Sequence, residues 1–158
     1  MTRALAVTNP RHVETQLVSA LNSLPGITIK ETDRIGKDGQ FEIGPMMVSI
    51  GPEVDLPAVR SMVEEACRPA TLPETVEALT RLALVTAHQS PWTEATLSAY
   101  ADLLCDYPGD AVLDVVRNWH KRGSKWFPTG PEIVESVEIR ARRRLRIRDA
   151  LRSKEKAA

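Results

Sequence analysis

The sequence has few aromatic residues, only two cysteines and no long apolar run. Aromatic side chains make up 4% of the 158 residues, and all three tryptophans and both tyrosines fall between residues 90 and 132. Cys67 and Cys105 are far apart, with neither CxxC spacing nor histidines nearby. This spacing argues against a zinc site or a disulfide framework and fits two thiols in a reducing cytoplasm.

No apolar run approaches the roughly 18 residues that a membrane-spanning helix needs. The first ten residues, MTRALAVTNP, contain one arginine and lack the apolar segment of a signal peptide. We therefore expect a cytoplasmic protein without a membrane partner.

Motifs for catalysis and for cofactor binding are also lacking. The chain has no GxxxxGK[ST] loop to bind the phosphates of a nucleotide, and its one glycine pair around a lysine, at residues 36–39, is interpreted as a turn. His12, His88 and His120 stand on separate segments without metal-ligand spacing, and no serine lies in a GxSxG motif. These absences predict a protein that is not an enzyme and that needs no cofactor or metal.

The charge is balanced overall but unevenly distributed. The chain has 21 basic and 21 acidic residues, yet residues 138–158 contain nine Lys or Arg and three Asp or Glu. This segment carries a local charge of +6, and the remainder carries −6. A basic segment on an acidic body favours binding to nucleic acid or to an acidic protein surface.

Proline and capping residues divide the chain into short helices. Three helix starts have an N-cap residue followed by a proline or by an apolar stripe. The caps are Asn9 before Pro10, Asp55 before Pro57, and Thr71. The pattern predicts a mainly α fold: a small helical bundle with a short β-like insert and a basic C-terminal helix. The predicted regions are a flexible arm at 1–9, an N-terminal helical region at 10–70, a helical bundle at 71–140 and a basic helix or tail at 141–158.

The insert at residues 27–50 has a different pattern from the helices around it. Apolar and polar residues alternate at 27–29 and 41–43, Asp38-Gly39 is a turn pair, and glycine and proline flank these short runs. The pattern fits either two short strands that pack on helices or a mobile connector.

Residues 90–132 give the clearest helix signals. Ser90 and Pro91 predict a helix start, and residues 107–110 (Tyr-Pro-Gly-Asp) break that helix. A second apolar face follows, and Gly123 predicts its end. Thr129 and Glu132 form a capping-box pattern with proline between them, which predicts a third helix from residue 131.

The aromatic and proline residues of this stretch also suggest a family. The pattern consists of Trp92 and Tyr100, Tyr107-Pro108, Ala111-Val112 with Trp119, and Phe127-Pro128-Thr129 with Glu132-Ile133. Over residues 85–140 it resembles the phage replicative-helicase loader/inhibitor family. The resemblance implies a small helical bundle in a bacteriophage DNA-replication protein whose partner is a replicative helicase. In that family the bundle is N-terminal, whereas here it follows about 85 other residues.

Residues 119–127 interleave aromatic and basic side chains, a composition suited to single-stranded nucleic acid, in which bases stack on rings. Trp119 falls on the apolar face of its helix and Phe127 precedes a proline, so core packing is the simpler interpretation of both. Trp126 fits a surface anchor as well as a core residue. The binding candidates from this segment are Lys121, Arg122, Lys125 and Trp126.

The last helix keeps an apolar stripe to Leu145, and beyond it arginines surround the helix on nearly every side. A helix that is charged all round does not form a core, so we expect it to project into solvent or onto a partner. A solvated tail without a target is the alternative. The binding candidates from this segment are Arg140, Arg142, Arg143, Arg144, Arg146, Arg148 and Arg152.

The leading hypothesis is a replication accessory protein that binds a replicative helicase, or a replication initiator, and loads or inhibits the helicase without its own ATPase activity. DNA is a further possible partner. Two other hypotheses are a small DNA- or RNA-binding regulator, whose binding would weaken steeply with salt, and a structural or assembly protein of a phage particle. The sequence leaves the oligomeric state open.

Overall fold

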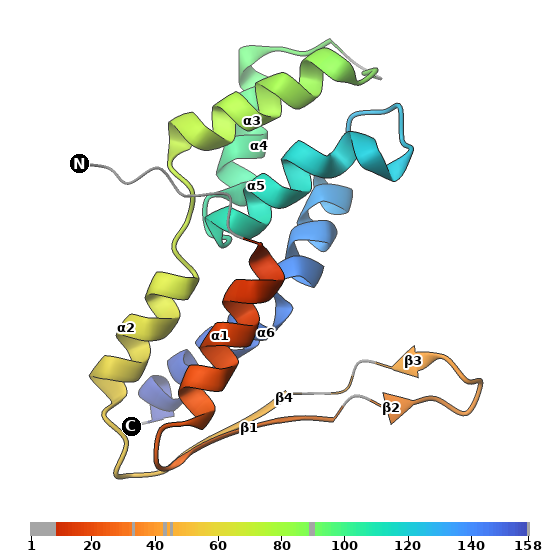
Figure 1. Ribbon diagram of the computed structural model, residues 1–158. Coiled ribbons are helices and arrows are strands. Elements are labelled where there is room, and N and C mark those ends of the chain that lie inside the picture. Colours follow the sequence, from red (N-terminus) through yellow and green to blue (C-terminus); the bar gives the residue numbers. More distant parts are fainter. Residues whose placement is uncertain (1–8, 33, 43, 45, 89–90, 158) are drawn as a thin grey trace. The chain divides into compact units, whose positions relative to one another are not determined.

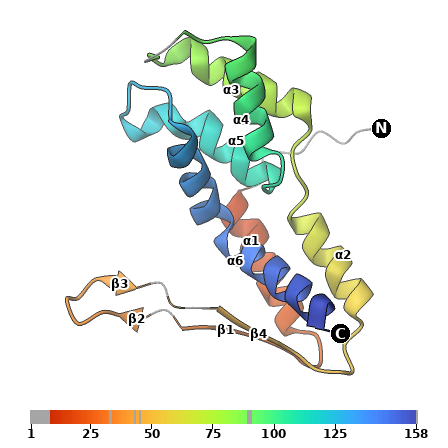
Figure 2. The same cartoon turned by 180° about the vertical axis from the view of Figure 1, so that it is seen from behind.

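The computed structural model describes residues 9–32, 34–42, 44, 46–88 and 91–157 (Figures 1 and 2). The chain divides into two compact units. Unit 1 comprises the chain up to Val13 together with residues 67–142, and unit 2 comprises residues 14–66 and 143–158. The predicted mainly α fold is confirmed, since six α-helices account for most of the described residues. The flexible arm predicted at residues 1–9 lies outside the described residues, apart from Asn9.

Unit 1 is a bundle in which α3 (Leu72–Val85) packs against α4 (Glu94–Leu104) and α5 (Gly109–Asn118). A 3-10 turn, η1 (Trp119–Arg122), continues α5, and the first part of α6 (Gly130–Ala157) completes the unit. The core side chains are almost fully buried and apolar. They include Leu79, Leu82, Leu104, Val112, Val116, Trp119, Ile133 and Val137.

Two capping boxes start helices of unit 1: the one at Thr129 was predicted as such, and Thr71 was predicted as a helix cap. The Thr71 hydroxyl accepts from the backbone N–H of Glu74 at 3.4 Å, and the Glu74 carboxylate accepts the Thr71 backbone N–H at 2.9 Å. Thr129 and Glu132 repeat the arrangement at the start of α6, with the same distances to within 0.1 Å. The Thr71 and Thr129 backbone N–H groups lower the pKa of the Glu74 and Glu132 carboxyls, because they stabilise the charged form.

The predicted start of α4 is wrong. The helix begins at Glu94, and its N-cap is Thr93, whose hydroxyl accepts the backbone N–H of Thr96 at 3.2 Å. Pro91 precedes the helix, and Ser90 lies outside the described residues. Thr93 with Glu94 in the first turn is itself a good helix start. Trp92 therefore stays outside the helix, where its ring packs on other aromatic rings.

Two glycines of unit 1 are required by the backbone. Gly109 begins α5 with its N–H donating to the Arg68 carbonyl at 2.9 Å, and a Cβ there would collide with the backbone of Ala70. Gly123 ends η1 with φ near 80°, as its predicted helix-ending role requires.

Unit 2 joins helices to a long hairpin. Residues of α1 (Pro10–Asn22), α2 (Leu56–Ala66) and the last part of α6 lie alongside one another in both views (Figures 1 and 2). The hairpin resolves the open question about residues 27–50. Strand β1 (Ile27–Glu31) pairs antiparallel with β4 (Met46–Ile50), and the short β2 (Arg34–Ile35) pairs with β3 (Phe41–Glu42).

The hairpin is attached to unit 2 by its base. Ile27 faces Ile50 in the register, and both are buried, whereas Ile35 near the tip is 75% exposed. In both ribbon views the β2–β3 end extends away from the helices of the unit (Figures 1 and 2). The base of the hairpin is therefore buried, whereas its tip is exposed.

The last part of α6 does not project into solvent, contrary to our expectation. Ile147 and Leu151 are 1% and 6% exposed, and Arg144 is fully buried. The apolar stripe thus continues past Leu145 at three- and four-residue spacing, with an arginine in one of its positions. Residues 143–158 are an integral part of unit 2 and not a separate tail. No helix among the described residues is long and apolar enough to cross a membrane.

Candidate partner-binding surface

Residues 119–127, here called the basic loop, present the first set of predicted binding residues on unit 1. Lys121, Arg122 and Lys125 are exposed, and Trp126 is 43% exposed. Trp119 is buried at 7% exposure, which confirms the core interpretation of that ring. The open alternative for Trp126 is resolved in favour of the surface.

Two cations of the loop, Arg122 and Lys125, have an aromatic neighbour. The Arg122 guanidinium lies 4.8 Å from the centre of the Trp119 ring, and its Nη1 donates to the Ser136 hydroxyl at 2.8 Å. The Lys125 ammonium lies 5.4 Å from the centre of the Trp126 ring. Both distances allow cation–π attraction. Lys125 and Trp126 together form an exposed pair with a flat apolar face and a positive charge.

The backbone of the basic loop is held in place by Ala87, which follows the end of α3. Ala87 donates its N–H to the Lys125 carbonyl at 2.7 Å and accepts the Phe127 N–H at 2.9 Å, which forms a single parallel bridge. The Trp119 indole N–H donates to the Trp126 carbonyl at 3.3 Å. Because these bonds use main-chain groups, the side chains of residues 125 and 126 remain available to a partner.

A cluster of rings lies behind the loop. Phe127 packs on Trp92 with ring centres 4.7 Å apart and on Tyr100 edge-to-face at 5.2 Å, and His88 lies 5.5 Å from Phe127. The Tyr100 hydroxyl donates to the Pro128 carbonyl at 2.7 Å. Burial, with a smaller contribution from the Glu132 carboxylate, raises the pKa of Tyr100, so this hydroxyl keeps its proton as a donor.

These rings also line a hollow of about 180 Å³ together with Thr96 and residues 128–130. Trp92, Tyr100 and Phe127, which are among the residues that carry the resemblance described above, therefore pack α4 against the turn that precedes α6. Their role in the described structure is to position the basic loop.

The second predicted set, the arginines of α6, is placed quite differently. Arg144 does not face a partner, because its side chain is fully buried in unit 2. Its Nη1 donates to the carbonyl of Ala66, the last residue of α2, at 2.6 Å, and its Nε lies 3.9 Å from the Glu14 carboxylate. Arg144 thus satisfies a helix-terminal carbonyl that would otherwise lack an intrahelical partner. Its predicted role in partner binding is wrong.

Glu14 is the acidic counterpart of this buried arginine. One carboxylate oxygen accepts the backbone N–H of Arg143 at 3.1 Å and that of Arg144 at 3.4 Å. Burial raises the pKa of Glu14 above its ordinary value, and it outweighs the opposing effects of the N–H donors and of the arginine charges. No local pattern indicates this pair, because 130 residues separate its members.

Other arginines of α6 bind the chain itself. In unit 2, Arg143 forms a two-bonded ion pair with Glu31 of β1, at 2.6 and 2.9 Å, and Arg146 donates to the Gly44 carbonyl at 2.7 Å. In unit 1, Arg140 lies 3.5 Å from the Asp114 carboxylate. Arg142 is half-buried. The predicted set is therefore not one binding surface.

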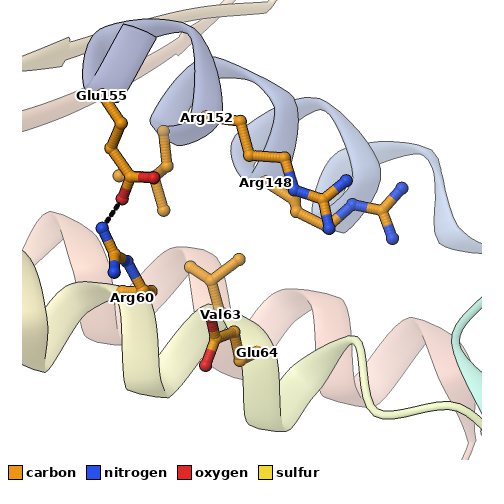
Figure 3. A pocket seen from close by; sticks show the side chains of 7 residues that line it. Arg60, Val63, Glu64, Arg148, Arg152 and Glu155 are labelled. Carbon is orange, nitrogen blue, oxygen red and sulfur yellow. Dashed lines mark ion pairs between the residues drawn. The ribbon is translucent and has the colours of Figure 1, made fainter.

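Arg148 and Arg152 have a third kind of environment. Both line a small hollow in unit 2 together with Arg60 of α2 (Figure 3). Arg148 is half-buried, with its Nε 3.6 Å from Asp149, and Arg152 is exposed. Sequence reasoning missed Arg60, because a single arginine on an amphipathic helix has no local signature of a site.

Among the described residues, no group of three or more histidine, cysteine, aspartate or glutamate side chains is placed to hold a metal ion. Comparison with protein-family models, curated proteins and solved structures gave no match.

Proposed function

We propose that this protein is a DNA-replication accessory protein of a bacteriophage or prophage that binds a replicative helicase, and loads or inhibits it, without hydrolysing nucleotide. It acts by stoichiometric binding through the basic loop of unit 1. The observation that carries the proposal is the pair formed by Lys125 and the 43% exposed Trp126 on a backbone held by three hydrogen bonds.

The chemistry of this surface suits a protein partner. Tryptophan and arginine are enriched among the residues that contribute most to protein interfaces, and a loop that is already ordered loses little entropy on binding. Trp126 supplies the apolar anchor, while Lys121, Arg122 and Lys125 favour a negatively charged surface around it.

The family resemblance supports the helicase as the partner. The residues that carry it, such as Trp92, Tyr100 and Phe127, form the ring cluster that positions the basic loop. The helices α4, α5 and the start of α6 follow one another with short connections, which is compatible with a small helical bundle and supports the resemblance.

The test is co-elution of the full chain with the replicative helicase of its host. We expect a complex at micromolar concentration, and the Trp126→Ala variant is expected to weaken it at least about tenfold. Leu84→Ala is the matched control, because it removes another exposed apolar side chain of unit 1, 81% exposed, outside the loop. Absence of a complex, or equal loss in both variants, would contradict the proposal. Truncation before α6 ends is unsuitable, because it removes core residues of unit 2.

Direct binding of single-stranded nucleic acid is a second candidate function. The Lys125–Trp126 pair favours it, since a base can stack on the ring while the ammonium neutralises a phosphate. Binding of an oligonucleotide measured over a salt series decides the matter. Loss of Lys121 and Lys125 should lower the slope of log K against log salt by roughly 0.7 for each phosphate contact removed.

A further inference from the structure

A groove on unit 1, here called the α3–α5 groove, lies between two helices that pack against each other (Figure 1). One side is lined by residues of α3 from Ala78 to Val85, and the other by the end of α5 and the start of η1, from Val116 to His120. Its volume is about 310 Å³, at the lower end of the roughly 300–1,000 Å³ of pockets that bind small ligands. The groove reaches the basic loop only at His120, and none of the four binding residues of that loop is among the described residues that line it.

The floor of the groove is apolar and almost fully buried. Ala78, Leu82 and Val116 are 4%, 3% and 1% exposed. Ala78 carries a single methyl group, so it leaves space between the helices that a larger side chain of α3 would fill. Beside this floor, Val85 is 67% exposed and presents apolar surface to water. An apolar side chain of a partner would cover that surface favourably.

The rim of the groove is basic. Arg81 and Arg117 line it and are exposed, and His120 beside them is exposed as well. No aspartate or glutamate is among the described residues that line the groove. Two guanidinium groups and an imidazole therefore surround an apolar floor.

Two carboxylates of α3 already interact with these arginines, and neither lines the groove. Glu77 pairs with Arg81 at 2.7 Å, but both side chains are largely exposed, so water screens the pair. Glu74 is held by the Thr71 backbone N–H at 2.9 Å. The pKa of Glu74 is lowered mainly by its hydrogen bonds with Thr71 and less by the charge of Arg117. An acidic partner would thus compete only with exposed interactions, whereas its own contacts would form beside an apolar floor.

We propose that the α3–α5 groove binds an acidic peptide segment of a partner protein, which places one apolar side chain on the floor and carboxylates on Arg81 and Arg117. Arginine suits this task, since its planar group bonds both oxygens of a carboxylate at once. A nucleic acid fits less well. Sites for single strands combine cations with aromatic rings, and no tryptophan, tyrosine or phenylalanine is among the described lining residues.

The first experiment measures the fluorescence anisotropy of a labelled peptide, Asp-Glu-Asp-Phe-Asp-Glu-Asp, titrated with the full chain at constant ionic strength. We expect binding in the micromolar range. A peptide with Asn and Gln in place of the acidic residues, and a peptide with Ser in place of Phe, should each bind at least about tenfold more weakly. Absence of binding by the acidic peptide would overturn the proposal, as would equal binding of the three peptides.

Arg117→Gln tests the basic rim. It is expected to weaken binding of the acidic peptide at least about tenfold, since it removes a charge-assisted contact. Lys30→Gln is the matched control, because it removes one exposed positive charge from unit 2, and it is expected to change the affinity less than about twofold. Glu77→Gln removes the carboxylate that competes for Arg81 and is expected to strengthen binding about twofold. Equal losses in Arg117→Gln and Lys30→Gln would show a general attraction to positive charge and would refute the groove as the site.

Val85→Glu tests the groove without removing an arginine. It adds a carboxylate at an exposed lining position, where repulsion should weaken binding at least about fivefold. Leu84→Glu adds the same charge at the neighbouring exposed position, which does not line the groove, and less than about a twofold change is expected. Unchanged circular dichroism would show that both variants keep their helices. Equal effects of the two variants would mean that the peptide binds elsewhere.

Competition with a single-stranded oligonucleotide distinguishes the two kinds of partner. If the oligonucleotide displaces the peptide and its own binding is reduced equally by Arg117→Gln, the groove is a nucleic-acid site and the proposal is wrong. Failure of the oligonucleotide to displace the peptide would support it. These assays contain no helicase, so their outcome is independent of the co-elution test of the proposed function.

Discussion

The basic loop of unit 1 and the arginines of α6 in unit 2 are alike in sequence, since both are short stretches dense in positive charge. Their surroundings differ. Lys121 and Lys125 are exposed, and no carboxylate neutralises them among the described contacts. Arg143 and Arg144 instead bind carboxylates and carbonyls of distant segments. The same charge is exposed to solvent in one unit and contributes to internal cohesion in the other.

The difference teaches which property of a basic run indicates its role. Arg144 lies on the stripe that Ala141, Ile147 and Leu151 share, so the helix brings it into the core. The basic loop has no such periodicity beyond η1, and Gly123 ends the helical geometry. A basic residue at a position of the buried apolar stripe of a helix has a structural role. A basic side chain in a loop that is held by backbone hydrogen bonds remains accessible to a partner.

The largest effect on the free energy of unfolding is expected from Arg144→Ala. It leaves the Glu14 carboxylate buried beside fewer charges and the Ala66 carbonyl without its donor. Breaking a buried ion pair in this way costs about 3–5 kcal/mol of the free energy of unfolding. Urea unfolding followed by circular dichroism should show the loss.

Fluorescence gives the control for that variant. All three tryptophans belong to unit 1, so their emission reports on that unit. We expect the circular dichroism transition of Arg144→Ala to move more than the fluorescence transition. A loss below about 1 kcal/mol, the value of an exposed pair, would contradict the buried role of Arg144.

A smaller, pH-dependent effect is expected from Glu14→Gln. The folded state raises the pKa of Glu14, so it binds the proton more tightly than the unfolded chain does. The stability contributed by this protonation is fully present below the ordinary pKa of 4.5 and is lost as the pH rises through the raised value. Gln resembles the protonated carboxyl and does not titrate, so from pH 4 to 7 the urea midpoint of the wild type should fall relative to that of Glu14→Gln. Parallel curves would show that Glu14 titrates normally.

Arg143→Ala tests the partly exposed end of the same arrangement. Its bidentate pair with Glu31 links α6 to β1, but both side chains are about one-third exposed. The expected loss is about 0.5–1 kcal/mol. Hydrogen exchange of the β1–β4 amides should accelerate in this variant, and unchanged exchange would show that the pair does not hold the hairpin.

The smallest effect on stability is expected from the double variant Lys121→Ala with Lys125→Ala. Both side chains are exposed, so the free energy of unfolding should stay within about 0.5 kcal/mol of the wild type. Thermal unfolding checks this. A larger loss would mean that the basic loop is structural, like the arginines of α6.

Local signals in the sequence predicted much of this fold. The caps at Asn9, Asp55, Thr71 and Thr129 all start helices where a proline or glutamate follows at the right position. The start of α4 was missed because Thr93 competes with Ser90 within three residues, and packing of the Trp92 ring favours the later start.

Long-range pairing could not be predicted from local patterns. Nothing near residue 144 shows that Glu14 or the end of α2 will meet it, so an arginine in the apolar stripe was interpreted as surface. For the candidate site, Lys121, Arg122, Lys125 and Trp126 were predicted as binding residues because they lie close together in sequence, but the pattern left open whether Trp126 is exposed. The position of Arg60 was not predicted, since only the folded chain brings it to Arg148 and Arg152.

Helix α6 is shared by both units, and this has a consequence for synthesis at the ribosome. Unit 1 uses Ile133 and Val137 in its core, while unit 2 uses Ile147 and Leu151. Neither core can close until this helix has left the exit tunnel, although most of the other elements emerge earlier. At a translation rate of about 5–20 residues per second, α1 waits several seconds for its partner. During that interval the nascent chain exposes apolar faces, and it is then a natural client for chaperones.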